Sequence, residues 1–229
     1  MTEASAATRP EILVNCAVSL DGRLAYAGGR RALLSGPEDL ARVQALRAGV
    51  DAIVVGLGTV LADDPSLRVH WDLLDRPPER APLRIVLDSM GRTPDRARVL
   101  DGSLPTLIVT SDRADRRFPA PVRTLKAGRV QVELPRLWAG LLELGIQSVL
   151  VEGGASVLAS VLRSDAFDRL TVYVAPVLIG GRDAPSLILG PECPGPGATV
   201  PLVLESAERL GEGVLLAYRS GRPRPGPAP

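Results

Sequence analysis

The sequence is poor in aromatic residues and carries almost no net charge. Phe, Trp and Tyr make up 3% of its 229 residues, too few for the stacked platform that holds single-stranded nucleic acid. Lys and Arg (27) nearly balance Asp and Glu (26), so no long-range positive field attracts nucleic acid or an anionic membrane. We therefore expect neither partner. Any anionic ligand must be bound by a local arrangement of residues.

Histidine and cysteine are also scarce. His70 is the single histidine, and Cys16 and Cys193 are the only cysteines. This set cannot supply a zinc site built from thiolates and imidazoles, so no metal is expected. A disulfide between two such distant cysteines has no support in the pattern, and we expect both to be reduced.

Targeting and membrane-spanning segments are missing as well. No apolar run is long enough to span a bilayer, and residues 1–10 lack the apolar core of a signal peptide. We expect a cytoplasmic protein. Proline and glycine in 221–229, and the polar start at 1–10, predict disordered ends around one domain at 11–220.

Short β-branched runs alternate with helical segments along this domain. The alternation predicts an α/β fold with a largely parallel central sheet and helices on both faces. The last segment instead indicates two antiparallel strands joined through Gly211–Gly213, which makes the sheet mixed. Strands are expected at 11–19, 51–56, 83–89, 106–111, 148–154 and 170–181, with two more within 200–219, and helices at 137–144 and 155–162.

A further helix is expected between Ser35 and Gly49. The segment Ser35-Gly-Pro-Glu38 has the pattern of a capping box, and Leu40, Val43 and Leu46 recur on one helical face. Arg47 stands near its end. The ordinary role of such an arginine is to balance the helix dipole, and the alternative is a planar clamp for a substrate phosphate.

The segment 148–162 (SVLVEGGASVLASVL) carries the most informative local pattern. A buried strand ends at Glu152, two glycines allow close approach of the backbone, and a helix follows. The free N–H groups at a helix start favour a phosphate, although a simple tight turn explains the same pattern equally well. The carboxylate of Glu152 is harder to explain that way, because ligands of open α/β sheets bind at the carboxyl ends of strands.

A second cluster lies at 55–70 (VGLGTVLADDPSLRVH). Thr59 offers a hydroxyl just after a strand, and Asp63-Asp64-Pro65 forms a polar turn. His70 closes this loop. A lone histidine is more often a surface or packing residue than a catalyst, and no nucleophile elbow accompanies it.

These clusters occur in an order that resembles the reductase domain of riboflavin biosynthesis, most closely its stand-alone archaeal and fungal form. Singly the motifs are modest, but six in order span nearly the whole domain. They are VNCAVSLDGRLA (14–25), the segment 35–70, RIVLDS (84–89), SVLVEGGASVL (148–158), DRLTVYVAPVLIGG (168–181) and GEGVLL (211–216).

The resemblance implies a dihydrofolate-reductase-like fold, a homodimer, and hydride transfer from NADPH to C1′ of a ribosylaminopyrimidine 5′-phosphate. For this reaction we hypothesise that Glu152 is the catalytic residue, which favours positive charge developing at the nitrogen. The cofactor-binding residues that the resemblance implies are Ala17, Val18, Leu33, Thr59, Asp63, Ser89, Gly153, Gly154, Ala155, Ser156, Val157 and Leu158. The substrate-binding residues that it implies are Asn15, Arg31, Arg47, Leu67, His70 and Glu152.

Two features narrow this resemblance. Bacterial two-domain members carry lysine at the position of Asn15 and arginine at that of His70, so the sequence follows the stand-alone form, and it lacks the cysteine and histidine ligands of their zinc deaminase domain. The pattern leaves open whether the pyrimidine carries a 2-amino or a 2-oxo group. It also leaves two rivals: a pteridine- or folate-type reductase, and a nucleotide-binding module without turnover.

Overall fold

The computed structural model describes residues 8–74, 80–164, 166–189 and 195–222. Most of the two predicted disordered ends, and Cys193, lie outside these ranges. Arg9 lies inside them, and its guanidinium forms an ion pair with Asp168 at 2.6 Å. This ion pair holds Arg9 beside the start of the strand Arg169–Ala175.

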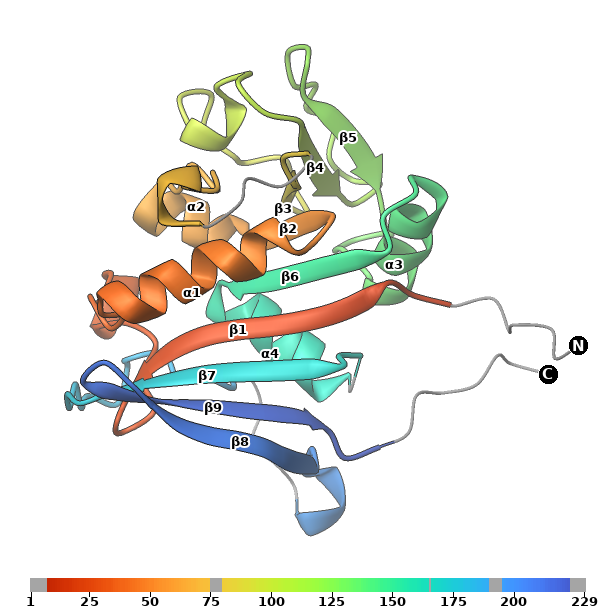
Figure 1. Cartoon of the computed structure of the whole chain (residues 1–229). Helices are drawn as coiled ribbons and strands as arrows, with labels where there is room; N and C mark the ends of the chain where they lie inside the picture. Colours follow the sequence, from red (N-terminus) through yellow and green to blue (C-terminus); the bar gives the residue numbers. More distant parts are fainter. Residues whose placement is uncertain (1–7, 75–79, 165, 190–194, 223–229) are drawn as a thin grey trace, which may run out of the picture.

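A single nine-stranded sheet runs through the described part of the chain, in the order β5-β4-β3-β2-β6-β1-β7-β9-β8 (Figure 1). All neighbours are parallel from β5 to β7, whereas β9 is antiparallel to both β7 and β8. The predicted mixed, mostly parallel sheet is confirmed. The strands are β1 (Glu11–Ser19), β2 (Ala52–Gly56), β3 (Leu83–Leu87), β4 (Thr106–Thr110), β5 (Arg123–Lys126), β6 (Ser148–Gly153), β7 (Arg169–Ala175), β8 (Leu202–Leu210) and β9 (Gly213–Ser220).

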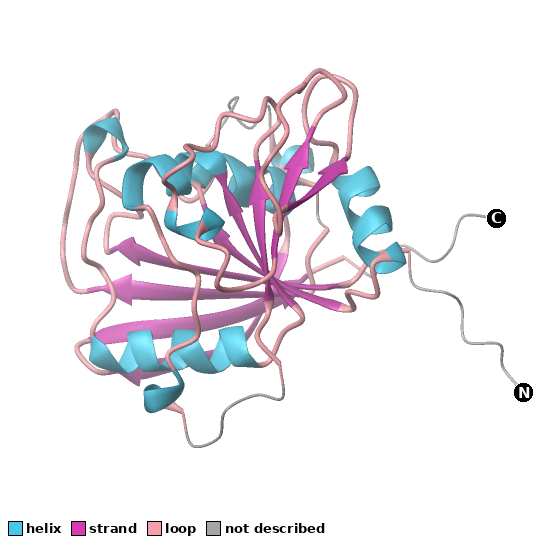
Figure 2. Cartoon of the chain, turned by 90° about the horizontal axis from the view of Figure 1, so that it is seen from above, coloured by secondary structure: helices cyan, strands magenta, loops and turns pink. Residues whose placement is uncertain are grey.

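Helices lie on both sides of the twisted sheet (Figure 2). Residues of α1 and α2 pack on one face with Ile53 and Leu150, and residues of α3 and α4 pack on the other with Val14 and Val151. None of the described helices is long and apolar enough to cross a membrane. They are α1 (Pro37–Ala48), α2 (Leu57–Asp63), α3 (Leu134–Glu143) and α4 (Ala155–Arg163), with single turns η1 (Ala27–Gly29), η2 (Trp71–Leu73), η3 (Arg98–Leu100) and η4 (Pro196–Ala198).

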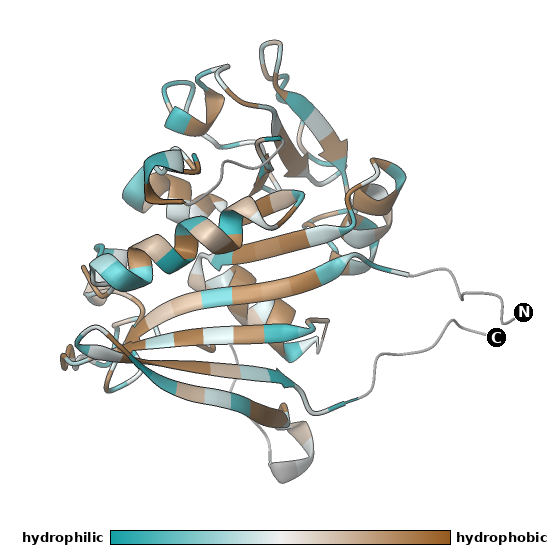
Figure 3. Ribbon diagram, viewed as in Figure 1, coloured by the Kyte–Doolittle hydropathy of each residue, from teal (hydrophilic) through white to brown (hydrophobic). Residues whose placement is uncertain are grey.

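The core is aliphatic, as the shortage of aromatics requires. Strands β2, β4 and β6 are buried on both faces and consist largely of Val, Ile and Leu, the composition expected of central parallel strands. The hydropathy colouring follows this arrangement, with apolar residues along the central strands (Figure 3). The edge strand β8 is instead largely exposed.

Three predicted features differ from the observed ones. The strand expected at 170–181 ends at Ala175, because Pro176 has no N–H group for the ladder. The capping box is wrong: Gly36 is the N-cap of α1, and the Ser35 hydroxyl donates to the carboxylate of Asp39. Helix α1 also buries Asp39 and Gln44, while Leu40 is 47% exposed.

One arginine is completely buried in the sheet. Arg84 of β3 is 0% exposed and donates to the Asp101 carboxylate, the Thr106 hydroxyl and three carbonyl groups, among them that of Ser66. It thereby ties β3 to the segment that follows α2. A buried charge of this kind is costly unless every donor is paired.

We predict that Arg84→Met lowers the free energy of unfolding by about 3–5 kcal/mol. Asp101 is 33% exposed and can be solvated, but several other acceptors lose their donor at once, and each unpaired buried group costs about 1–3 kcal/mol. Denaturant unfolding measures the change. Arg68→Met is the matched control, because Arg68 bonds the same Asp101 with a side chain that is 48% exposed, and such pairs contribute about 0–1 kcal/mol. Equal losses in the two variants would show that burial of Arg84 does not matter.

Candidate active site

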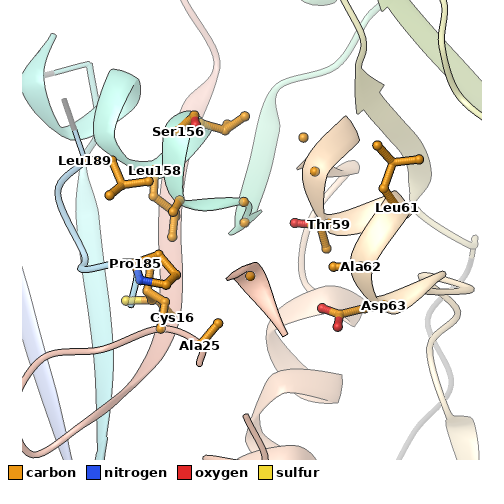
Figure 4. Close-up of a pocket in the computed structure, with 18 of the residues that line it drawn as sticks. Cys16, Ala25, Thr59, Leu61, Ala62, Asp63, Ser156, Leu158, Pro185 and Leu189 are labelled. Atoms are coloured by element: carbon orange, nitrogen blue, oxygen red, sulfur yellow. The ribbon is translucent and has the colours of Figure 1, made fainter. Parts of the chain in front are cut away.

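A cavity of about 940 Å³ opens at the carboxyl ends of the central strands, a volume within the range of roughly 300–1,000 Å³ typical of ligand pockets. Figure 4 shows side chains of α2 on one side of it and Pro185 and Leu189 on the other. Strand β6 lies between β1 and β2 in the sheet, where the order of connections reverses and open α/β sheets bind ligands.

The turn between β6 and α4 forms a narrow part of this cavity. A Cβ atom at Gly153 or Gly154 would lie 3.2 or 3.1 Å from the hydroxyl of Thr59, and one at Gly56 would lie 2.7 Å from Val157. Side chains at these positions would crowd the backbone turn against α2. The glycines therefore keep α2, β2 and the start of α4 in close contact.

The start of α4 offers unused hydrogen-bond donors. Gly154 is its N-cap and provides no side chain, and the first turn contains no acidic residue. The first amides of a helix, here those of Ala155 and Ser156, have no partner within the helix. A helix start with these properties favours an anionic group such as a phosphate.

Two loops form the opposite wall. The Arg23 guanidinium donates to the carbonyl of Ala184 at 2.9 Å, and the Leu24 amide donates to the carbonyl of Pro185 at 2.8 Å. These bonds hold the segment after β1 against the segment after β7. Both segments contribute lining residues, including Gly28, Gly29 and Arg182.

Glu152, the last residue of β6 before the two glycines, lines the cavity and forms an ion pair with Arg47 of α1. Its two oxygens accept from Nε and Nη2 of Arg47, each at 2.7 Å, the bidentate geometry of strong arginine–carboxylate pairs. Burial opposes the charge on Arg47, but Glu152 outweighs it and raises the pKa of Arg47. Nη1 of Arg47 also donates to the carbonyl of Arg68 at 3.1 Å.

Asp63 at the end of α2 is the second acidic residue at the cavity that the sequence predicted. Burial raises the pKa of Asp63 above its usual value, and the positive charge of Arg31 opposes this shift. Arg31 is exposed and has no place among the lining residues. Although Asp63 is itself an exposed residue, its carboxyl therefore ionises at a higher pH than a free aspartate.

Ten of the predicted site residues line the cavity, among them the whole segment 153–158. Their positions follow from one strand end, one helix start and the adjacent α2. They are Ala17, Thr59, Asp63, Glu152, Gly153, Gly154, Ala155, Ser156, Val157 and Leu158.

The other predicted residues have different surroundings. Val18 and Leu67 are buried, Leu67 with a φ of 51° that is rare for leucine, and Leu33 is 82% exposed. The Ser89 hydroxyl accepts from the amide of Val132. The structure thus does not bring these four to the cavity wall.

His70 and Asn15 also lie outside the lining set. The His70 side chain is exposed, and its backbone amide donates to Gln44 of α1 at 3.0 Å. Asn15 is 6% exposed, and its amide oxygen accepts from Arg42 of α1 at 2.7 Å. Both residues are therefore connected to α1, the helix that carries Arg47.

Several lining residues had no signal in the sequence. The segment 182–185 follows β7 by several residues, and only the folded chain brings it to the β1 loop. Cys16 had been assigned no role beyond that of a reduced, small residue. The missed residues are Cys16, Leu24, Ala25, Gly28, Gly29, Gly56, Leu57, Gly58, Leu61, Ala62, Leu87, Arg182, Asp183, Ala184, Pro185 and Leu189. Within the described ranges, no group of three or more His, Cys, Asp or Glu residues is arranged to hold a metal ion.

Fold and site together define an α/β protein with a cavity at the carboxyl edge of a mixed sheet, bordered by a helix start that favours an anionic group. Residues 10–216 match the model of the RibD C-terminal domain. The chain belongs to this family, and its fold is the predicted dihydrofolate-reductase-like one.

Two archaeal relatives match the chain over almost their full length. The 2,5-diamino-6-ribosylamino-4(3H)-pyrimidinone 5′-phosphate reductases of Methanothermobacter thermautotrophicus and Archaeoglobus fulgidus are 40% and 36% identical to the chain. These matches cover 92% and 93% of the chain and 98% and 100% of the relatives.

Solved structures agree on the fold. The chain resembles Acinetobacter baumannii RibD with a TM-score of 0.80 at 25% identity, over 94% of the chain and 59% of RibD. It resembles the Saccharomyces cerevisiae riboflavin biosynthesis reductase Rib7 with a TM-score of 0.73 at 23% identity, over 96% and 93%.

Cys16 provides a test of the cavity's interior. Burial raises the pKa of its thiol to about 12, and the positive charge of Arg42 opposes the shift. Because the thiolate is the reactive form, we predict that a Cys193→Ser variant reacts with a thiol reagent at pH 8 roughly 100-fold more slowly than the same chain in denaturant. Rapid labelling of the native variant at pH 8 would contradict the protonated, buried state.

Proposed function

We propose that the protein is an NADPH-dependent reductase of riboflavin biosynthesis. Its substrate would be the ribosylaminopyrimidine 5′-phosphate named for its archaeal relatives, and its product the corresponding ribitylamine. The observation that carries this proposal is the similarity to those two reductases along almost the whole of all three chains. The cavity beside Glu152 supplies a place for the chemistry.

The cavity fits a dinucleotide cofactor in two respects. Its volume of about 940 Å³ accommodates an extended ligand. Gly153 and Gly154 have no side chains, and there is little room for any, so a ligand can approach the backbone at the start of α4. We assign the amides of Ala155 and Ser156 to a cofactor phosphate, and Thr59 and Ala17 to its neighbouring parts. When bound, NADPH supplies the hydride.

Glu152 is the catalytic residue in this proposal. Reduction adds a hydride at C1′ and a proton at the nitrogen of the open-chain imine, so positive charge at that nitrogen favours the reaction. A fixed carboxylate near the nitrogen stabilises that charge electrostatically. Arg47 holds the carboxylate in place through its two bonds. Three of the five N–H groups of Arg47 are bonded within the described chain, so two remain for a substrate phosphate.

The proposal includes a homodimer in the cytoplasm. None of the described helices covers the α1 face of β7, β9 and β8 (Figure 1). Leu40 of α1 and Val203 of β8, which the strand register places on this face, are 47% and 38% exposed. An uncovered sheet face with exposed apolar residues supports association with a second copy. Arg31, Leu67 and His70 stay assigned to the substrate side.

The direct test is anaerobic NADPH oxidation with the diaminopyrimidinone and the aminouracil ribosylamine phosphates, each product identified by its mass. We expect a gain of two mass units with at least one of them. Dihydrofolate serves as a third substrate, and its reduction alone would favour a folate-type reductase. Binding of NADPH without its oxidation in the presence of any pyrimidine would instead indicate a nucleotide-binding module without turnover.

We predict that Glu152→Gln lowers kcat roughly 100-fold, because a neutral amide stabilises developing charge poorly, while the Kd for NADPH changes little. Steady-state rates and fluorescence titration measure the two quantities. Asp183→Asn is the matched control, since it removes a carboxylate elsewhere on the cavity wall. Unchanged turnover in Glu152→Gln would remove Glu152 from the mechanism.

A further inference from the structure

A buried polar network joins α1 to the sheet beside Glu152. Nε and Nη2 of Arg42 donate to Oδ1 of Asp39 at 2.9 and 2.7 Å. Nη2 also donates to Oδ1 of Asn15 at 2.7 Å, and the Thr171 hydroxyl lies 2.8 Å from that same oxygen. Asp39 and Asn15 are 1% and 6% exposed, so water competes little for these bonds.

The chemistry of Arg42 fixes the direction of these bonds. A guanidinium carries donors and no acceptor, so the Asn15 group that faces it must be the amide oxygen. The Thr171 hydroxyl accepts from Nη1 of Arg42 at 3.5 Å. Its own proton has two acceptors within reach, and the Asn15 oxygen at 2.8 Å is closer than the Val14 carbonyl at 3.4 Å. Both partners of Asn15 therefore bond its oxygen, and its NH2 group is turned away from them.

The NH2 group of Asn15 is left without an acceptor among the described residues. No hydrogen bond from it is formed in those ranges, and it is also absent from the fully buried, unpartnered polar atoms. The amide nitrogen of Asn15 is therefore not completely shielded from solvent. A nearly buried amide group with two free donors is a position at which a ligand can gain hydrogen bonds.

Strand register places Asn15 beside Glu152. Val14 of β1 pairs with Val151 of β6 in a parallel ladder, and Asn15 and Glu152 each follow by one residue, on the α1 face of the sheet. The next residues of β1, Cys16 and Ala17, line the cavity, as does Glu152. A donor and an acceptor thus lie side by side, and each is held by an arginine of α1.

We infer that Arg42 is a positioning residue which orients the Asn15 amide so that only its NH2 group meets the substrate. Asn15 then recognises a hydrogen-bond acceptor of the heterocycle, a ring nitrogen or a carbonyl oxygen, while Glu152 stands ready beside it as an acceptor. The Asn15 oxygen is not free to accept from a 2-amino group. This inference rests on the proposed function and names the part of the pyrimidine that Asn15 recognises.

Asn15→Asp tests the orientation with little change of shape. Aspartate offers an oxygen to Arg42 and Thr171 and replaces the free donor with an acceptor. We expect the Kd of the pyrimidine substrate, measured by equilibrium binding, to rise roughly 100-fold, because a site made for one hydrogen-bonding group rejects its opposite. The Kd of NADPH should change less than twofold. Pyrimidine affinity equal to that of the wild type would overturn the inference.

Arg42→Gln tests the positioning role without altering Asn15. Glutamine offers both a donor and an acceptor, so the Asn15 amide is free to turn, and we expect the KM of the pyrimidine to rise about tenfold with little change in kcat. Arg42→Lys, which keeps a donor and no acceptor, should recover most of the lost affinity. Arg169→Gln is the matched control, because Arg169 of β7 is an exposed arginine whose ion pair is with Glu205.

The outcomes separate this inference from the proposed function. Absence of pyrimidine-dependent NADPH oxidation in the wild type would overturn both. If the wild type is active but Arg42→Gln binds the pyrimidine as tightly as Arg42→Lys does, the inference alone is overturned. A parallel loss of NADPH affinity and thermal stability in Arg42→Gln, with no recovery in Arg42→Lys, would assign Arg42 a purely structural role.

Discussion

Helix α1 and the carboxyl end of β6 meet through the ion pair between Arg47 and Glu152. The pair fixes a carboxylate one residue before the glycine turn that begins α4. Arg47 also bonds the carbonyl of Arg68, so one guanidinium joins three segments that are distant in the sequence. The position of Glu152 relative to the start of α4 therefore depends on where α1 lies.

Stability alone does not explain this arrangement. A buried ion pair is often no more stable than a well-packed apolar pair, because both charges lose their hydration. What the pair gains is geometry, since two parallel bonds set both the distance and the angle of the carboxylate. This is the property that electrostatic stabilisation of a developing charge requires, since the charge must be in place before the reaction.

Much of the fold was predictable because its central strands are short apolar runs. β2, β4 and β6 each contain three consecutive Val, Ile or Leu residues, and their short length and β-branched content favour a buried strand over a helix. β5 was missed because Arg123–Lys126 is short and mostly exposed, so it has no alternation to detect. α2 was missed because the polar turn at Asp63-Asp64-Pro65 indicated a loop, whereas burial of Leu57 and Val60 holds a short helix there.

The cavity wall was predictable where it is continuous in sequence. The segment 153–158 follows one strand and opens one helix, so its residues share a wall of the cavity. The residues that depend on tertiary structure were not accessible in that way. The pairing of Arg42 with Asn15 spans 27 positions and that of Arg47 with Glu152 spans 105. Local pattern carries no information about such pairs.

The packing of α1 explains why these pairs are possible. An ordinary amphipathic helix presents an apolar stripe to the core, but α1 buries Asp39 and Gln44. Apolar burial is non-directional, and a helix held by it alone can rotate or slide without losing much contact area. Hydrogen bonds lose their strength on a small change of angle. The buried polar residues of α1 therefore fix the rotation of this helix. They thereby also fix the positions of Arg42 and Arg47, which orient Asn15 and Glu152.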